Sequence, residues 1–477
     1  MEKSNVNAAG AASHKGHVIA IVAMFFLFAM ISFVTNLAAP IGTIWGNQFA
    51  GNGVLGMMGN MMNFLAYLFM GIPAGNMLVK IGYKKTALLA MAIGIVGLFV
   101  QYLSSLVGAD SVVFTMTSNI DEGGVMVARE YTVCWNFIVY LLGAFICGFC
   151  VCMLNTVVNP MLNLLGGGGN KGNQLLQAGG ALNSFAGTIT PFFVGALIGQ
   201  LTKDTTMHAV TPLLFVAMGI FVLTLIIISM VKIPEPNLRK KGEVAPKYSH
   251  SPWNFRHTVL GVIGIFIYVG IEVGIPGTLN FYLSDQKAAG AGVIGNASAI
   301  AGAVVAVYWL LMLCGRTLSS AISGKVSTRT QLITVSTVAI MLVITAICLP
   351  KEVTFEVPSF IYNDNGMTAQ IPVSALLLVL CGLCTSVMWG GIFNLAVEGL
   401  GKYTAQASGI FMMMVVGGGV LPLLQNWIAD SCGYIPSYWL IVAGLLYLLY
   451  YGIIGYKNVN TDIPVSEEPS QTEQEYL

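Results

Sequence analysis

Twelve long apolar runs divide this 477-residue chain and limit it to one broad class of fold. About twenty apolar residues cross the hydrocarbon core of a bilayer as a helix. Only 9% of the residues are charged and the mean hydropathy is +0.79, whereas soluble domains carry about 25% charged residues. Most of the surface must therefore face lipid. We expect an all-α membrane protein with spanning helices at 17–45, 53–79, 85–107, 131–165, 174–201, 209–232, 257–284, 296–323, 330–349, 372–399, 405–429 and 436–456.

The lysines and arginines fall mostly on one side of this array. With the N-terminus inside, sixteen of them lie on the inner side and four on the outer side. This positive-inside bias predicts a multi-pass protein of the plasma membrane, in a bacterium the inner membrane, with both termini cytoplasmic. Two polar stretches, at 108–130 and 350–371, are expected to form external loops.

A basic, proline-containing segment at 233–256 separates six spans from six and predicts two halves. The expected organisation is an N-terminal six-helix bundle, this cytoplasmic linker and a C-terminal six-helix bundle, with a polar tail at each end. The acidic tail after the last span is expected to be disordered. The N-terminal tail covers 1–16, the first bundle 17–232, the linker 233–256, the second bundle 257–456 and the C-terminal tail 457–477.

The two halves repeat short patterns in the same order. Asn36 lies four residues before Pro40, and Glu272 lies four residues before Pro276. The turn after the second span of each half reads KIGYK (80–84) or KVSTR (325–329), and the fourth spans end in NLLG and EGLG. Parallel halves of this kind place a substrate at their interface, near the middle of the membrane.

Glu272 is the only carboxylate near the centre of a span. A charge there costs about 2.5 to 3.5 kcal/mol on insertion scales, so it usually has a function. We expect it to bind a coupling cation, a proton or sodium; the alternative is a fixed pairing with a neighbouring donor. Arg316 is a candidate partner only at similar depth, and the predicted depths differ. Four charges near span ends are expected to gate the pathway or to be structural: Lys80, Lys84, Arg316 and Glu398.

Amides and aromatic rings also interrupt the apolar runs. Asn155 and Asn159 are spaced four apart, which puts them on one helix face, and Asn183 lies in the next span. Amides donate and accept hydrogen bonds, which suits sugar hydroxyls; hydrogen bonding between helices is the alternative. Trp389 and Tyr268 lie inside spans, where a ring could stack on a pyranose or simply pack in the core.

The chain resembles the major facilitator superfamily and, within it, the fucose–galactose–glucose:proton symporter family. The resemblance covers nearly all twelve spans and is most specific in FMGIPAGNMLVKIGYKK (69–85), IYVGIEVG (267–274) and VVGGGVLPLLQNWIAD (415–430). It implies a monosaccharide substrate. Where the family usually has proton-linked carboxylates in its first and fourth spans, this chain has Asn36 and Asn155, and amides do not titrate near neutral pH.

The expected function is secondary active uptake of a neutral hexose or deoxyhexose by alternating access, with cation symport through Glu272. The substrate is expected to be neutral because an anion would favour a central basic residue, and Arg316 lies toward the inner side. The alternatives are an uncoupled sugar facilitator, or a carrier or exporter of another small solute. No enzyme activity, cofactor, metal, nucleic acid or obligate protein partner is expected. Five residues are expected to line the sugar site: Asn36, Asn155, Asn159, Asn183 and Trp389.

Overall fold

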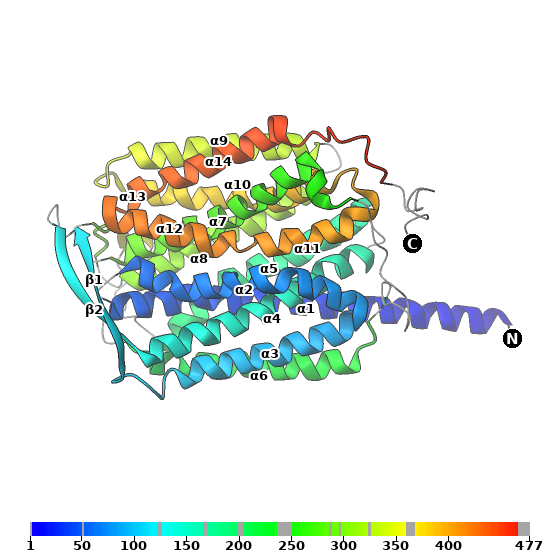
Figure 1. Ribbon diagram of the computed structural model, residues 1–477, viewed down its shortest axis with the longest axis horizontal. Helices are drawn as coiled ribbons and strands as arrows, with labels where there is room; N and C mark the ends of the chain where they lie inside the picture. The colour runs from blue at the N-terminus through cyan, green and yellow to red at the C-terminus, as the bar shows by residue number, and fades with distance from the viewer. Residues whose placement is uncertain are drawn as a thin grey trace.

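The computed structural model of the chain is a bundle of long helices that run side by side (Figure 1). It describes residues 2–49, 52–121, 126–165, 169–198, 205–233, 235, 250–285, 289–294, 297–322, 326–358 and 368–465. Most of the expected linker and most of the C-terminal tail lie outside these ranges. The expected N-terminal tail continues the first helix, which begins at Glu2.

Six long helices form the N-terminal half: α1 (Glu2–Gln48), α2 (Gly53–Lys80), α3 (Tyr83–Leu103), α4 (Trp135–Leu165), α5 (Gly169–Ile198) and α6 (Thr211–Met230), the last preceded by the short helix η1 (Met207–Val210). The C-terminal half begins with η2 (Pro252–Asn254), α7 (Arg256–Ser284), α8 (Ala297–Ile322), α9 (Thr328–Cys348) and α10 (Val373–Val397). It ends with η3 (Gly401–Tyr403), α11 (Thr404–Met414), α12 (Gly417–Cys432), α13 (Tyr434–Ser437), α14 (Trp439–Tyr450) and the π-helical turn η4 (Tyr451–Gly455).

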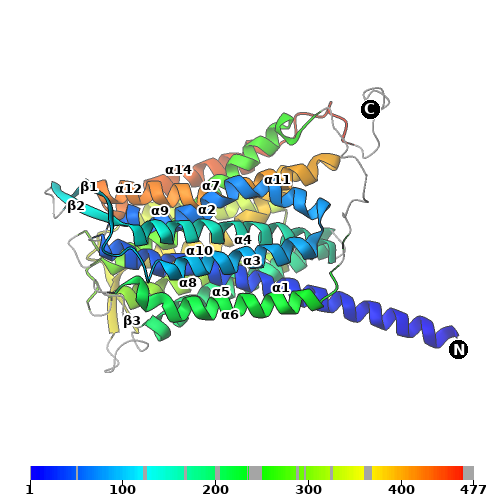
Figure 2. The ribbon, with the colours of Figure 1, turned by 60° about the horizontal axis from the view of Figure 1, so that its bottom comes forward.

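The helices confirm the expected twelve-span architecture. Within the described residues, eleven helical segments are long and apolar enough to cross a membrane. One of them joins α11 and α12, and another runs from α13 through η4. Helix α5 completes the set of twelve, and it packs between the two halves against α1 and α8 (Figures 1 and 2).

The two expected external connections lie outside the spanning helices, and each contains a pair of antiparallel strands. Strands β1 (Val112–Asp121) and β2 (Met126–Cys134) pair antiparallel, as do β3 (Thr354–Pro358) and β4 (Thr368–Pro372). The expected start of the fourth span at 131 is therefore wrong, because α4 begins only at Trp135. Tyr131 and Val133 are buried while Thr132 between them is exposed. This alternation is the pattern of a strand, and its apolar members extend the apolar run of the helix that follows.

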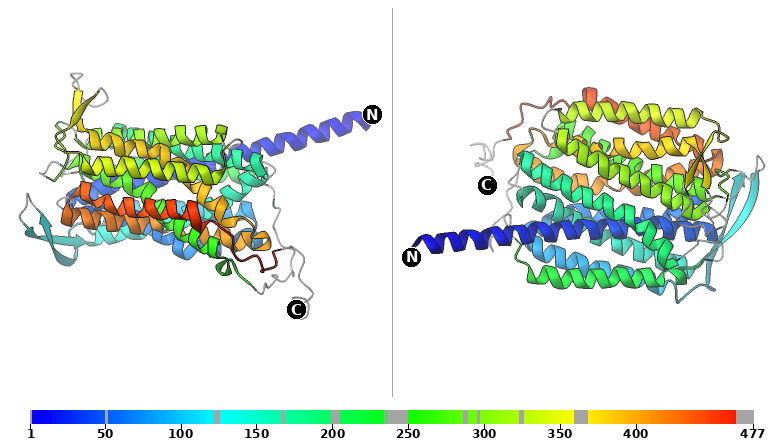
Figure 3. Two further views of the ribbon diagram at one scale, coloured as in Figure 1. Left: turned by 90° about the horizontal axis from the view of Figure 1, so that it is seen from above. Right: turned by 180° about the vertical axis from the view of Figure 1, so that it is seen from behind.

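Both hairpins lie at one end of the bundle, and α1 begins at the opposite end (Figure 3). Toward the end where α1 begins, α7 and α11 diverge from α1 and α6 (Figure 2). Toward the hairpin end the halves meet: Asn280 of α7 donates from Nδ2 to Thr43 Oγ1 of α1 at 3.1 Å. The two halves therefore touch at the hairpin end, whereas toward the other end α7 and α11 diverge from α1 and α6 while α2 stays packed against α11.

The eleventh span is broken where its glycines begin. Helix α11 ends at Met414 and α12 starts at Gly417. Pro422 lies inside α12, and since proline has no N–H, the carbonyl of Gly418 four residues earlier loses its helical partner. Asn60 of α2, in the other half, donates to this carbonyl at 2.9 Å. The expected single helix at 405–429 is therefore two helices, and Pro422 frees a carbonyl for a contact between the halves.

Helices α3 and α4 cross closely because glycines face each other. A Cβ added at Gly97 would lie 2.7 Å from the backbone nitrogen of Cys147 and 3.1 Å from the carbonyl of Gly143. Since small residues let membrane helices approach, we expect Gly97→Ala to lower stability by about 1 to 3 kcal/mol. The thermal denaturation of detergent-solubilised protein measures this. Gly75→Ala in α2 is the matched control, because its Cβ would meet nothing within 4 Å. Equal melting temperatures for the two variants would contradict this account of the crossing.

Candidate functional site

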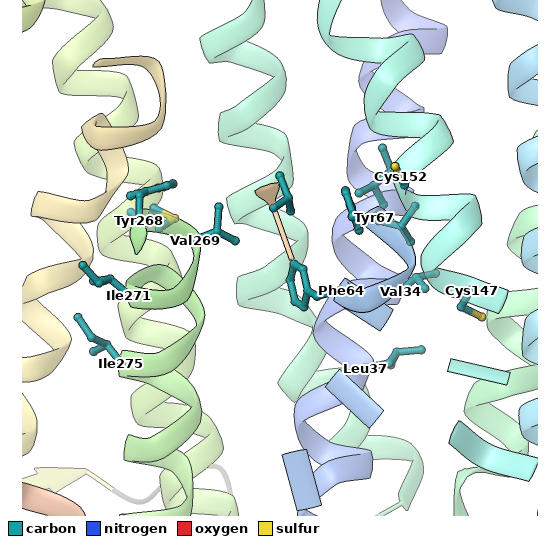
Figure 4. Close-up of a cluster of buried hydrophobic side chains, with 14 of the residues drawn as sticks. Val34, Leu37, Phe64, Tyr67, Cys147, Cys152, Tyr268, Val269, Ile271 and Ile275 are labelled. Carbon is teal, nitrogen blue, oxygen red and sulfur yellow. The ribbon is translucent and has the colours of Figure 1, made fainter. Parts of the chain in front are cut away.

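A central cavity of about 180 Å³ opens between the two halves. Its walls come from α1, α2, α4 and α5 on one side and from α7, α8, α10 and α11 on the other. Figure 4 shows apolar side chains of both halves beside the cavity, with Phe64 of α2 on the side that faces Val269 of α7. The cavity brings together Glu272 and all five residues expected at the sugar site: Asn36, Asn155, Asn159, Asn183 and Trp389.

Asn36 is held on the α1 side of the cavity by its own helix. Its Nδ2 donates to the carbonyl of Ser32 at 2.8 Å and lies 3.1 Å from the Ser32 hydroxyl. The Ser32 hydroxyl in turn donates to the backbone carbonyl of Asn183 on α5. Ser32 therefore links Asn36 to the backbone of Asn183, and this link fixes α1 against α5 at the cavity wall.

Asn155 and Asn159 of α4, like Asn36, donate through their amide nitrogens to other groups of the protein. Nδ2 of Asn155 donates to the hydroxyl of Tyr67 at 2.8 Å and to the carbonyl of Val151 at 3.1 Å. Nδ2 of Asn159 donates to the carbonyl of Asn155 at 2.9 Å. Within the described part of the chain, the Oδ1 atoms of Asn36, Asn155 and Asn159 accept no hydrogen bond. The N-terminal wall thus presents amide oxygens, which can accept from hydroxyl groups.

Arg316 and Glu272 form an ion pair on the opposite wall, contrary to the different depths that the sequence predicted. Nη2 of Arg316 lies 3.3 Å from Oε1 of Glu272, and the two side chains are 11% and 16% exposed. Side chains on a helix lean toward its N-terminus. Because α8 runs from the hairpin end toward the opposite end, the long arginine side chain extends back toward the centre of the bundle. A residue near the inner end of a span therefore reaches the cavity.

Arg316 also connects the two halves. Its Nη1 donates at 2.6 Å to the carbonyl of Gly180, on α5 of the N-terminal half. A Cβ added at Gly180 would lie only 3.3 Å from Nη1, a tight contact, so glycine leaves this carbonyl open to the guanidinium group. Glu272 is thus joined to the other half through one guanidinium group. Any change in the charge of Glu272 acts directly on this connection.

Aromatic rings complete the C-terminal wall. The rings of Trp389 and Tyr268 lie 6.1 Å apart at 53°, and Tyr268 is fully buried although it borders the cavity. Tyr67 and Trp309 are among the lining residues that were not found from the sequence. Trp309 could have been found by the signal that identified Trp389, an indole in the middle of an apolar span. Tyr67 offered no such signal, because its role depends on the contact with Asn155.

The other expected gating charges lie away from the cavity. Lys80 and Glu398 are exposed at the ends of α2 and α10 and do not line it. Lys84 binds the carbonyls of Ser229 and Val231, at the end of α6, at 2.6 and 2.8 Å.

In the C-terminal half, Arg329 makes the equivalent contact. It donates from Nε to the carbonyl of Gly452 at 3.0 Å, at the end of the last span. These two residues hold the same place in the repeated KIGYK and KVSTR turns. Each fastens the third helix of its half to the sixth, and cations suit the carbonyl ends of helices.

Comparison with known proteins gives a consistent picture. A sequence profile of the Major Facilitator Superfamily matches residues 20–423. A glucose/galactose transporter of Brucella abortus is 28% identical over 453 residues, covering 94% of this chain and 96% of the relative. The L-fucose-proton symporter of Escherichia coli is 22% identical over 404 residues, covering 80% of each. The crystal structure of the E. coli fucose:proton symporter superposes with a TM-score of 0.62 at 17% identity, over 92% of this chain and 98% of that one, which shows a shared fold.

Proposed function

Because this chain belongs to the major facilitator superfamily, we propose that it takes up a neutral monosaccharide, a hexose or deoxyhexose, together with a cation. One observation carries the proposal: amide oxygens, an indole and a single ion-paired carboxylate face one cavity between two helical halves. A cavity so placed can be exposed to each side of a membrane in turn. The protein is a transporter and not an enzyme, like its curated relatives.

The chemistry of the walls supports a sugar. The oxygens of Asn36, Asn155 and Asn159 accept hydrogen bonds from hydroxyl groups, and the face of Trp389 packs on the C–H face of a pyranose. Relatives named for glucose, galactose and L-fucose agree with this substrate class. Arg316 lies in the cavity, but Glu272 balances its charge. No unmatched cation is therefore present among the described lining residues to attract an anionic substrate.

Glu272 supplies the coupling in this proposal. A proton or sodium ion that binds its carboxylate competes with Arg316, which weakens the link from Glu272 through Arg316 to Gly180. The cation then changes the relative stability of the two open states, and its gradient drives accumulation. Transport proceeds across a bacterial plasma membrane with both termini in the cytoplasm, as the positive-inside bias favours.

An uncoupled sugar facilitator is the second candidate. It is favoured by the amides at Asn36 and Asn155, where the resembling family has carboxylates, and by the pairing of Glu272 with Arg316. If that pair persists throughout the cycle, the carboxylate has no free state in which to bind a cation. The two candidates share the sugar site and differ only in the response to an ion gradient.

Purified protein in proteoliposomes tests the proposal. Uptake of radiolabelled D-glucose, D-galactose, L-fucose and D-glucuronate is measured with no gradient, with an inward proton gradient and with an inward sodium gradient. We expect at least one neutral sugar to accumulate under one of the two gradients. Uptake that no gradient stimulates would favour the facilitator. Transport of glucuronate alone would overturn the assignment of a neutral substrate.

Asn159→Leu tests the amide oxygens. The Nδ2 group of Asn159 bonds only within its own helix, so the substitution removes an acceptor from the cavity at little structural cost. The loss of one hydrogen bond, about 1.5 kcal/mol, corresponds to a rise of roughly tenfold in KM for the preferred sugar. Asn394→Leu in α10, exposed and outside the cavity, is the matched control. An unchanged KM in the Asn159 variant would remove this residue from the site.

A further inference from the structure

Trp309 lies where the two halves touch beside the cavity. It belongs to α8 of the C-terminal half, is half-buried and lines the cavity. It faces Gly187 of α5 in the other half: a Cβ added there would lie 3.4 Å from Cδ2 of the indole and 3.0 Å from Nδ2 of Asn36. The missing side chain at Gly187 therefore leaves room for the indole next to an amide of the expected sugar site.

The backbone that carries this indole is firmly held. Tyr308 is fully buried, and its hydroxyl lies 2.9 Å from Oγ1 of Thr385 and 3.3 Å from the carbonyl of Glu272. That carbonyl is free to accept because Pro276 has no N–H to donate to it. The rings of Tyr308 and Trp309 meet edge to face, with centroids 5.6 Å apart at 88°. The indole therefore extends from a backbone position that the contacts of Tyr308 hold in place, and its edge packs with the Tyr308 ring.

The indole of Trp309 carries one N–H donor beside the cavity. Indole N–H groups usually find a partner when they are buried. Beside the cavity, this group can donate to a ligand oxygen. Trp309 thus combines an apolar face with one polar donor, whereas the neighbouring Asn36 offers an acceptor.

We propose that Trp309 is a second aromatic wall of the sugar site and determines which sugar epimers it admits. The inference rests on the proposed function. Trp309 and Trp389 reach the cavity from α8 and α10, while the amide oxygens reach it from α1 and α4. A pyranose has apolar C–H faces and a rim of hydroxyls, and the two walls match these two surfaces.

The epimer preference follows from steric fit. An equatorial hydroxyl leaves the ring face free to lie on the indole, whereas an axial hydroxyl on that face holds the ring away. Glucose and galactose differ in this respect at one carbon. The fixed position of Trp309 against Gly187 therefore distinguishes them by contact, in addition to any hydrogen bond.

Three variants test this role: Trp309→Ala, Trp309→Phe and Gly187→Ala, the last of which keeps the indole but places a methyl group between it and Asn36. KM and kcat are measured for D-glucose, D-galactose and L-fucose in proteoliposomes. We expect Trp309→Ala to raise KM about tenfold for the preferred sugar and to change the ratio of kcat/KM between epimers about fivefold or more. Trp309→Phe should restore part of the affinity, and Gly187→Ala should change the same ratio.

Trp427→Phe is the control, because this residue is 60% exposed on α12 and does not line the cavity. Sugar-dependent quenching of tryptophan fluorescence in detergent gives a second readout, which we expect to diminish in Trp309→Phe and to persist in Trp427→Phe. Epimer ratios within about twofold of the native value in all three variants would overturn the inference. If the native protein transports none of the sugars, the proposed function fails; if it transports them and the variants match it, only the role of Trp309 fails.

Discussion

Replacing Glu272 with glutamine is expected to abolish the accumulation of sugar against its gradient while leaving exchange of sugar across the membrane. Among the described residues that line the cavity, Glu272 is the only one with a carboxylate. Glutamine keeps the size and can still accept from Arg316, but it binds no proton and is a poor ligand for a lone cation. The measurement is uptake into proteoliposomes with an imposed gradient, compared with counterflow of labelled sugar at equal concentrations.

The matched control for this variant is Glu398→Gln. Glu398 is exposed at the end of α10 and lies outside the cavity, so its loss should leave accumulation intact. If Glu272→Gln accumulates sugar as well as the native protein, Glu272 is not the coupling residue. Loss of counterflow together with accumulation would indicate that the carboxylate is needed for sugar binding or folding, and would also contradict the coupling role.

Replacing Arg316 with methionine is expected to impair transport severely and to destabilise the protein. The substitution leaves Glu272 without its cation and removes the bond to the carbonyl of Gly180. Breaking a buried pair by removing one partner costs about 3 to 5 kcal/mol, and the partial exposure of both groups places the effect near the lower value. Arg316→Lys keeps the charge and should show an intermediate effect.

The double variant separates the charge from the contact. Combining Glu272→Gln with Arg316→Met removes both charges, so melting temperature and counterflow should recover relative to Arg316→Met alone, whereas accumulation should not. A double variant as unstable as Arg316→Met would show that the bond to Gly180, and not the ion pair, carries the effect.

The sequence predicted the architecture because the lipid bilayer imposes a simple rule. The lengths of the apolar runs and the placement of the charges were enough to predict twelve spans in two halves. The amides at Asn36, Asn155 and Asn159 and the carboxylate of Glu272 were also found from sequence, since polar groups are conspicuous in apolar runs. The sequence element Asn36–Pro40 recurs in the second half as Glu272–Pro276. This repeat predicted that the polar side chains meet in one cavity between the halves. Their roles in binding remain predictions.

Three features could not be predicted, each for a physical reason. The depth of Arg316 was misjudged because residue position along a helix does not show where a long side chain ends. Strand β2 was taken for the start of a helix because its buried residues, Tyr131 and Val133, merge with the apolar run of α4. Tyr67 was missed because a tyrosine in an apolar helix is ordinary, and only its contact with Asn155 from another helix places it at the site.

Hydrogen bonds between the halves contribute to the free energy that the conformational change requires. Asn60 to Gly418, Asn280 to Thr43 and Arg316 to Gly180 each cross from one half to the other. A typical hydrogen bond contributes about 1 kcal/mol net, because water replaces the lost partner. These three hydrogen bonds together therefore oppose separation of the halves by only a few kcal/mol, an amount that the binding of one small solute can supply. The weakness of these contacts leaves the molecule close to balance between its two orientations, so that cargo and ion, rather than the protein alone, decide which side is open.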